Sequence, residues 1–142
     1  MTSTHEAIEE LDERRCWELL AGAELCRLAV VVDSAPVIFP VNFLVDHVPD
    51  VSRLLVRTGA GTKLFAAVGA DLAVEVDGTD GGRAWSVVAE GVGTEVHDER
   101  GLALAHEHLP WLDSDKPHVL GIEVSRVEGR AFPLRRRPGA GA

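Results

Sequence analysis

The segment from Arg57 to Leu64 combines two cations, two threonine hydroxyl groups and two glycines in a way that suits phosphate binding. Glycines let the backbone approach a ligand closely, and the amide groups at the start of a helix carry partial positive charge. Arg57 and Lys63 add full positive charges, and Thr62 adds a hydroxyl group. The segment therefore predicts a phosphate cradle. An ordinary strand-to-helix turn, with Thr62 as the helix cap, fits the same residues.

The composition is that of a soluble globular protein with an acidic surface. The chain has 142 residues, 46% of them hydrophobic and 26% charged, which is enough for a core without disulfides. Its net charge of −9 argues against nucleic acid as a partner, because phosphate backbones are bound by basic surfaces. No apolar run approaches the roughly 20 residues of a membrane span, and no signal peptide is visible. We therefore expect a cytoplasmic protein that binds neither nucleic acid nor membranes.

The chain is expected to form one domain over residues 1–134, followed by a flexible basic tail over residues 135–142. The tail begins with three arginines and ends in Pro-Gly-Ala-Gly-Ala, which is typical of a frayed terminus. Cys16 and Cys26 are too few for a disulfide framework. We expect both to be buried, reduced thiols.

The hydrophobic pattern predicts three helical segments and six strands. The helices are expected at residues 12–22, 63–68 and 98–108, and the strands at 26–32, 37–45, 52–57, 71–76, 83–97 and 119–132. Pro40 interrupts the second strand, which indicates an edge, a bulge or a bend, and Gly91 and Gly93 in the middle of the fifth strand indicate a bulge or a sharp bend. Because the connections are mostly short, they favour antiparallel neighbours. The fold class is therefore mainly β with flanking α-helices, and the simplest arrangement is a closed or nearly closed barrel.

Six short motifs follow one another along nearly the whole domain, from about Leu11 to Arg130. They are Cys16-Trp17-Glu18-Leu19-Leu20, Arg27-Leu28-Ala29, Pro36 with Pro40-Val41-Asn42-Phe43, Arg57-Thr58 with Gly61-Thr62-Lys63-Leu64, Trp85-Ser86-Val87 with Gly91, and Val124 to Arg130. None is specific alone. Their order and spacing resemble the pyridoxamine 5′-phosphate oxidase-like superfamily of FMN-binding split barrels, in particular its small actinobacterial-type flavin and deazaflavin members.

The resemblance implies a six-stranded antiparallel split β-barrel that works as a homodimer, with the cofactor in the cleft between the subunits. The cofactor-binding residues that it implies are Arg57, Thr58, Gly61, Thr62 and Lys63 at the phosphate, Pro40, Val41, Asn42 and Phe43 along the ring, and Trp85 and Ser86 from the second subunit. Taken alone, Asn42 also fits a residue that bonds the backbone at a bend. Trp85 likewise fits an ordinary core residue.

The resemblance further implies an FMN- or deazaflavin-dependent oxidoreductase that transfers hydride to or from a small substrate. FMN is the expected cofactor, and the alternatives are the deazaflavin coenzyme F-420 and, after it, haem with His118 as a candidate ligand. Authentic pyridoxamine phosphate oxidases carry an Arg-x-His pair near the C-terminus, and this sequence contains none. Pyridoxamine phosphate is therefore not the expected substrate.

Two other functions stay open at this point, because no catalytic acid or base can be identified from the sequence. One is a non-catalytic flavin or haem carrier or sensor of the same fold, and the other is an interaction domain without a ligand. A metal site is not expected. His106 and His108 would point to different sides of a helix, and no cysteine or third histidine lies near them in the sequence.

Overall fold

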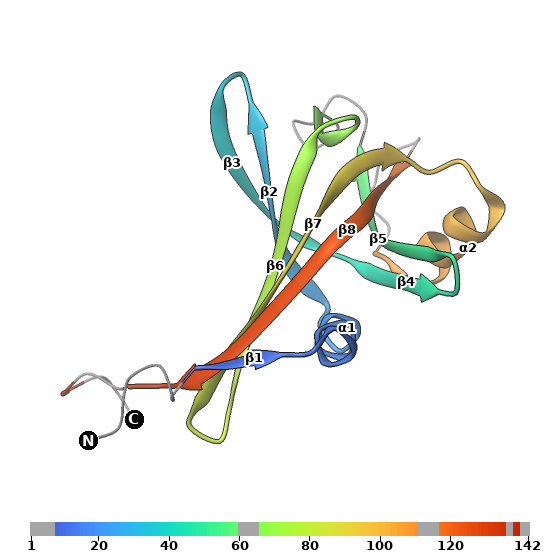
Figure 1. The fold of residues 1–142 in the computed structure, drawn as a ribbon. Helices are drawn as coiled ribbons and strands as arrows, with labels where there is room; N and C mark the ends of the chain where they lie inside the picture. The colour runs from blue at the N-terminus through green and yellow to red at the C-terminus, as the bar shows by residue number, and fades with distance from the viewer. Residues whose placement is uncertain (1–7, 60–65, 111–116, 136–137, 140–142) are drawn as a thin grey trace.

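The computed structural model describes residues 8–59, 66–110, 117–135 and 138–139. Within these ranges the chain forms one antiparallel sheet and two α-helices (Figure 1). The elements are β1 (Glu9–Leu11), α1 (Glu13–Ala21), β2 (Leu25–Val32), β3 (Ala35–Asn42), β4 (Leu44–Val48), β5 (Val51–Gly59), β6 (Asp71–Asp80), β7 (Arg83–Glu95), α2 (Glu99–His108) and β8 (Pro117–Pro133). In the described part of the chain, neither helix has the length and hydropathy of a membrane-spanning segment.

The sheet curls until its two end strands meet. Its strand order is β3-β2-β6-β7-β8-β5-β4, and β1 pairs with β8 beside this path. Although β3 and β4 lie at opposite ends of the order, only Phe43 separates them in the chain. Phe43 is buried in the core, and its amide donates to the Glu24 main-chain oxygen at 3.2 Å. The predicted mainly β, antiparallel split barrel with flanking helices is therefore confirmed.

The number of strands differs from the prediction, because the described residues form eight strands rather than six. The predicted strand over residues 37–45 divides into β3 and β4 at Phe43, where no turn-forming residue marks the change of direction. The short β1 is too polar and too brief for a periodic pattern to reveal it. Pro40 lies on β3, which pairs only with β2, and this edge position tolerates a residue without an amide hydrogen.

Helix α1 covers one end of the barrel and agrees closely with its prediction. The Asp12 carboxylate caps it by accepting from the Arg15 amide at 2.8 Å, and the helix stops before Gly22. Cys16 and Trp17 on its inner face are buried in the barrel core. Both cysteines of the chain are free and buried, as expected. Half of the helical segment predicted at residues 63–68, namely residues 63–65, lies outside the described residues, and residues 66–67 form a short 3₁₀ turn.

Gly91 and Gly93 mark a place where β7 approaches other backbone segments too closely for a side chain. The register between β7 and β8 shifts between Glu90 and Gly91, which is the predicted bulge. A Cβ atom at Gly91 would lie 2.1 Å from the Glu123 main-chain oxygen, and one at Gly93 would lie 1.9 Å from the Ala67 main-chain oxygen. These approaches require glycine because backbone atoms cannot move aside as a flexible side chain can.

Replacing Gly93 with alanine should therefore lower the free energy of unfolding by about 1–3 kcal/mol, the usual cost of overpacking. Urea unfolding followed by circular dichroism measures the change. The matched control is Gly22→Ala, because a Cβ there would meet its nearest atom at an ordinary 3.5 Å. Equal stability of the Gly93 and Gly22 variants would contradict the close approach of β7 to Ala67.

Candidate functional site

A small pocket lies where β3 passes into β4, next to β5 and the end of α2. Its volume is about 190 Å³, and it is lined by Pro40, Val41, Asn42, Arg57, Leu109 and Pro110. The walls are mostly apolar, with one amide and one guanidinium group. The structure thus brings together four of the residues predicted to bind a cofactor, although they come from two strands. The pocket suits an anionic group that is attached to an apolar or planar body.

Arg57 supplies the positive charge of this pocket. Side chains alternate along a strand, so Arg57 lies on the same face of β5 as Leu55, which packs against α2. Arg57 is partly buried, and this burial lowers the pKa of its guanidinium group relative to an exposed arginine. The group nevertheless stays protonated at neutral pH. A cation in such a low-dielectric setting attracts an anion more strongly than one in open water.

Asn42 is fixed at the point where β3 passes into β4. Its side-chain amide donates to the Glu24 main-chain oxygen at 3.4 Å, and the Phe43 amide donates to the same oxygen. This hydrogen bond reaches a residue 18 positions away rather than the backbone of the bend itself, and it holds Asn42 at the pocket wall. Phe43 is different, because its side chain belongs to the barrel core.

Of the other residues predicted at the phosphate, the structure describes Thr58. Gly61, Thr62 and Lys63 lie outside the described residues. Thr58 follows Arg57 directly and so lies on the opposite face of β5. It is only 3% exposed, and it is not among the described residues that line the pocket. The prediction of a hydroxyl contact from Thr58 therefore finds no support in the geometry of one protomer.

Trp85 and Ser86 lie far from the pocket within one protomer. Arg57 pairs with Val119 on β8, whereas Trp85 pairs with Ala131, twelve residues further along the same strand. At about 3.3 Å per residue this is roughly 40 Å along β8. The Trp85 ring covers Gly78, where a Cβ would lie 2.6 Å from it. Ser86 lines a separate hollow of about 340 Å³.

Leu109 and Pro110 line the pocket and were missed by sequence reasoning. Leu109 caps the C-terminus of α2, where its amide donates to the Ala105 main-chain oxygen at 3.0 Å. Its side chain is buried with Leu55 in a second, smaller core cluster between α2 and the sheet. A proline after a helix predicts only where the helix ends. The local pattern carries no signal for the part of the sheet that this end contacts.

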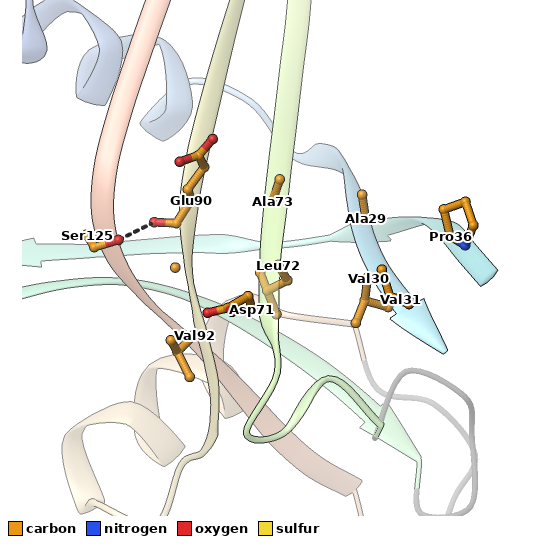
Figure 2. A pocket seen from close by; sticks show the side chains of 11 residues that line it. Ala29, Val30, Val31, Pro36, Asp71, Leu72, Ala73, Glu90, Val92 and Ser125 are labelled. Carbon is orange, nitrogen blue, oxygen red and sulfur yellow. Dashed lines mark hydrogen bonds between the residues drawn. The ribbon is translucent and has the colours of Figure 1, made fainter. Parts of the chain in front are cut away.

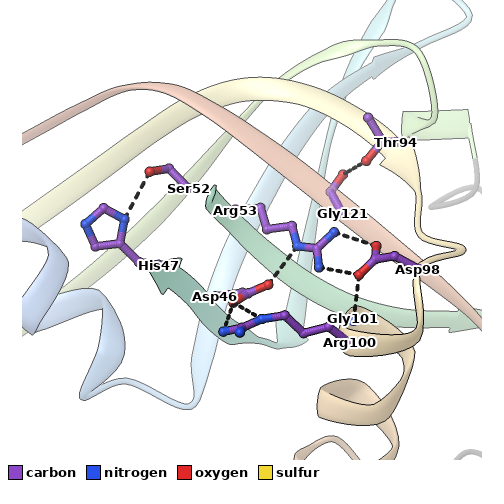
Figure 3. A network of polar contacts seen from close by, with 9 residues as sticks. All are labelled: Asp46, His47, Ser52, Arg53, Thr94, Asp98, Arg100, Gly101 and Gly121. Atoms are coloured by element: carbon purple, nitrogen blue, oxygen red, sulfur yellow. Dashed lines mark hydrogen bonds and ion pairs between the residues drawn. The ribbon is translucent and has the colours of Figure 1, made fainter. Parts of the chain in front are cut away.

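The other end of α2 is held by a network of charged side chains (Figure 3). Arg53 on β5 makes two bonds of 2.8 and 2.9 Å to Asp98, the N-cap of α2, and a third of 2.9 Å to Asp46 on β4. Arg100 also donates to Asp46, at 2.9 Å. Arg53 and Asp46 are buried. The network therefore ties the start of α2 to both strands of the β4–β5 hairpin.

This network should make stability depend on acid pH through Asp98. Its pKa lies well below the usual value because of the bonds from Arg53, and then because of the bond from the Gly101 amide. The unfolded state therefore binds a proton more readily than the folded state does. The resulting stabilisation is complete above the ordinary Asp pKa of about 3.9 and is lost as the pH falls below it.

We expect the difference in unfolding free energy between the native protein and Asp98→Asn to be constant near neutral pH and to shrink below about pH 4. Asparagine is chosen because it preserves the helix cap. Urea unfolding curves at several pH values provide the measurement. A difference that does not change with pH would show that the charge of Asp98 contributes nothing.

The histidines do not form a metal centre in the described residues. His118 shares a hydrogen bond of 2.9 Å with Glu95, and His97 lies 3.6 Å from the second carboxylate oxygen of Glu95. No group of three or more metal-ligating side chains occurs among the residues that the structure describes. His118 pairs with Thr58 across the β5–β8 ladder and does not line the Arg57 pocket.

A broad hollow also lies on the outer face of β2, β6 and β7 (Figure 2). It measures about 420 Å³, and the Ser125 hydroxyl donates to the Glu90 main-chain oxygen at its edge. Val31 on β2 is 62% exposed and Ile38 on β3 is 63% exposed. Ile38 lines a neighbouring hollow of about 400 Å³ on β2, β3 and β6. This face therefore presents large apolar side chains to solvent, together with a few carboxylates.

Comparison with known proteins identifies the family. The family model described as pyridoxamine 5′-phosphate oxidase matches residues 12–131. The chain belongs to this family. The match begins at the N-cap of α1 and ends near the end of β8, so it includes every residue that lines the Arg57 pocket. In this member of the pyridoxamine 5′-phosphate oxidase family, the Arg57 pocket lies where β3 passes into β4.

Similar proteins occur in actinobacteria. The uncharacterized protein Rv0080 of Mycobacterium tuberculosis is 33% identical over 127 residues, which is 86% of this chain and 84% of that protein. The FAD binding protein from Mycobacterium smegmatis is 35% identical with a TM-score of 0.78, covering 89% of this chain and 100% of its own. A conserved protein of unknown function from Corynebacterium diphtheriae is 32% identical with a TM-score of 0.75, covering 89% and 98%. The similarity thus extends over most of each of these chains.

Proposed function

We propose that this protein is a flavin-nucleotide-binding oxidoreductase that works as a homodimer. The observation that carries the proposal is the pocket in which Arg57 faces the Pro40–Asn42 segment at the seam of the barrel. The similar Mycobacterium smegmatis protein is an FAD binding protein, and FMN and FAD share the isoalloxazine ring, the ribityl chain and its phosphate. One cradle can therefore hold this shared part of either cofactor.

The residues of the pocket fit such a cofactor. Arg57 would hold the phosphate by charge-assisted hydrogen bonds, together with Lys63, for which the sequence predicts the same role. The apolar surface of Pro40 and Val41 would lie against the ring, and Asn42 would meet its polar edge. When bound, a flavin supplies hydride transfer at its ring, and the protein supplies position and electrostatics.

The size of the pocket supports a site that two protomers share. A volume of about 190 Å³ is below the roughly 300–1,000 Å³ of complete small-molecule sites, so one protomer can enclose only part of a flavin nucleotide. Trp85 lies near the start of β7. This end of β7, with its hairpin to β6, projects away from the barrel (Figure 1). Only a second copy would bring Trp85 and Ser86 to this pocket. The apolar outer face with Val31 and Ile38 is a suitable contact surface for that copy.

A non-catalytic flavin carrier or sensor is the second candidate function. The observation that favours it is the chemistry of the pocket wall, because the described lining residues include no carboxylate, histidine or thiol. A general acid or base would have to come from the substrate, from the second copy or from other residues. Turnover would then depend on a partner reductant or oxidant that binds at the same cleft.

Titration of the purified protein with FMN, FAD, coenzyme F-420 and haem tests the proposal. Saturable binding of FMN or FAD, with a sedimentation mass of two chains, is the supporting result. Tighter binding of F-420 than of FMN or FAD would identify a deazaflavin, rather than a flavin, as the cofactor. A Soret band with haem and no flavin binding would contradict the proposal. Flavin binding without reduction of the bound flavin by NADH or NADPH, and without reoxidation of the reduced flavin by a small-molecule acceptor, would favour the carrier function.

A further inference from the structure

Helix α2 lies along β5 and spans the distance between Arg53 and Arg57, the two arginines of that strand. Arg53, Leu55 and Arg57 share one face of the strand. Asp98 at the start of α2 bonds Arg53, the middle of α2 packs on Leu55, and Leu109 at its end lines the pocket with Arg57. The helix has 10 residues, or about 15 Å. This matches the roughly 13 Å that β5 needs from Arg53 to Arg57.

The two ends of α2 are fastened in different ways. At its start, Arg53 holds Asp98 with two parallel hydrogen bonds, and Asp46 holds Arg53 from the other side. The pairing of two nitrogens with two oxygens fixes direction as well as distance. At its end, Leu109 is held against the sheet by apolar packing with Leu55, which allows more sliding than a bidentate ion pair does. The position of the whole helix is therefore set mainly at Arg53.

We propose that the Asp46–Arg53–Asp98 cluster is a positioning device for the ligand site, because it fixes where Leu109 and Pro110 stand over Arg57. This inference rests on the proposed flavin site, since the ligand that it affects is the one held at Arg57. None of the three residues lines the pocket. Their effect passes through α2, which behaves as a rigid rod with the pocket wall at its far end.

A rigid helix transmits a displacement from one end to the other with little loss. The pocket is small, so a shift of Leu109 and Pro110 by about 1 Å changes how closely a phosphate and the attached chain can approach Arg57. Loss of a contact in the Asp46–Arg53–Asp98 cluster should therefore weaken ligand binding while the fold remains intact. The same change should leave the backbone amide hydrogens at the end of α2 less protected from hydrogen exchange, whether or not a ligand is present.

The test compares Asp98→Asn, Asp98→Ala, Leu109→Ala and the double variant Asp98→Ala with Leu109→Ala. The probe is FMN, titrated by fluorescence quenching at a temperature where every variant is fully folded. We expect Asp98→Ala to bind FMN about tenfold more weakly and Asp98→Asn less so, within the range of coupled neighbouring residues. In the double variant the losses of FMN affinity from the two single changes should not multiply, because the Leu109 side chain that the cluster positions has already been removed.

Two further measurements separate positioning from general destabilisation. Val74→Ala is the matched control, because Val74 is fully buried in the larger core away from α2, and it should leave FMN affinity unchanged. Hydrogen exchange of the Leu109 amide in the ligand-free protein should become faster in Asp98→Ala and stay unchanged in Val74→Ala. If Asp98→Ala fails to fold, Asp98→Asn carries both measurements.

The outcomes distinguish this inference from the flavin site itself. Weak FMN binding by Arg57→Ala together with native binding by Asp98→Ala would overturn the positioning role and leave the flavin site intact. Fully multiplicative effects in the double variant would also overturn it. Unchanged FMN binding by Arg57→Ala would overturn the flavin site. In that case native exchange at Leu109 in Asp98→Ala would overturn the positioning role as well, and faster exchange would support it.

Discussion

The double variant Arg57→Ala with Lys63→Ala should bind FMN about 10²–10⁴-fold more weakly than the native protein while it keeps its fold. Charge-assisted hydrogen bonds to a phosphate contribute roughly 1.5–3 kcal/mol each, so two of them correspond to about 3–6 kcal/mol of binding free energy. Arg57 is partly buried at the pocket wall, where water competes less with the ligand than it does on an open surface.

Fluorescence titration with FMN measures this loss, and each single variant apportions it between the two cations. The matched control is Arg14→Ala with Arg15→Ala, which removes the same two charges from the exposed side of α1. A similar loss in that control would mean that FMN responds to net charge alone. Native affinity in the Arg57 and Lys63 double variant would remove the basis of the phosphate cradle.

Local signals in the sequence were sufficient for much of the fold. Asp12 and Gly22 bracket α1 because capping depends on only a few neighbouring residues. Pro40 indicated an edge strand and Gly91 a bulge, since each residue type restricts the backbone at its own position. A bend near Pro40 was among the alternatives, but the division of the predicted strand at Phe43 was not, because the change of direction there depends on closure of the barrel.

The candidate site was predictable only in part, for a similar reason. The resemblance of Pro40, Val41, Asn42 and Arg57 to a known motif order gave four of the residues that line the pocket. Leu109 was missed because its contribution depends on where α2 packs, and that position is set by contacts between residues far apart in the chain. Arg53 and Asp98, separated by 45 positions, illustrate the difficulty. Neither residue has a neighbour in the sequence that indicates its partner.

The replacement of Arg53 with methionine should lower the free energy of unfolding by about 3–5 kcal/mol, the cost of removing one partner from a buried ion pair. Methionine retains an unbranched chain of similar length and so limits the change in packing. Arg53 is 8% exposed, and the Asp46 side chain that it bonds is 1% exposed. Asp46 would keep only its bonds to the more exposed Arg100. Urea unfolding at neutral pH measures the loss.

The control for this prediction is Arg15→Met, because Arg15 makes an ion pair to Glu18 on the exposed side of α1, away from the outer face proposed as the dimer contact. Such pairs are screened by water, so its stability should change little. A further variant, Arg53→Met with Asp46→Leu, separates the cost of an orphaned charge from the loss of the network. If the orphaned carboxylate causes the cost, the second change should restore part of the stability. If the double variant is no more stable than Arg53→Met, the cost lies instead in the lost attachment of α2 to β5.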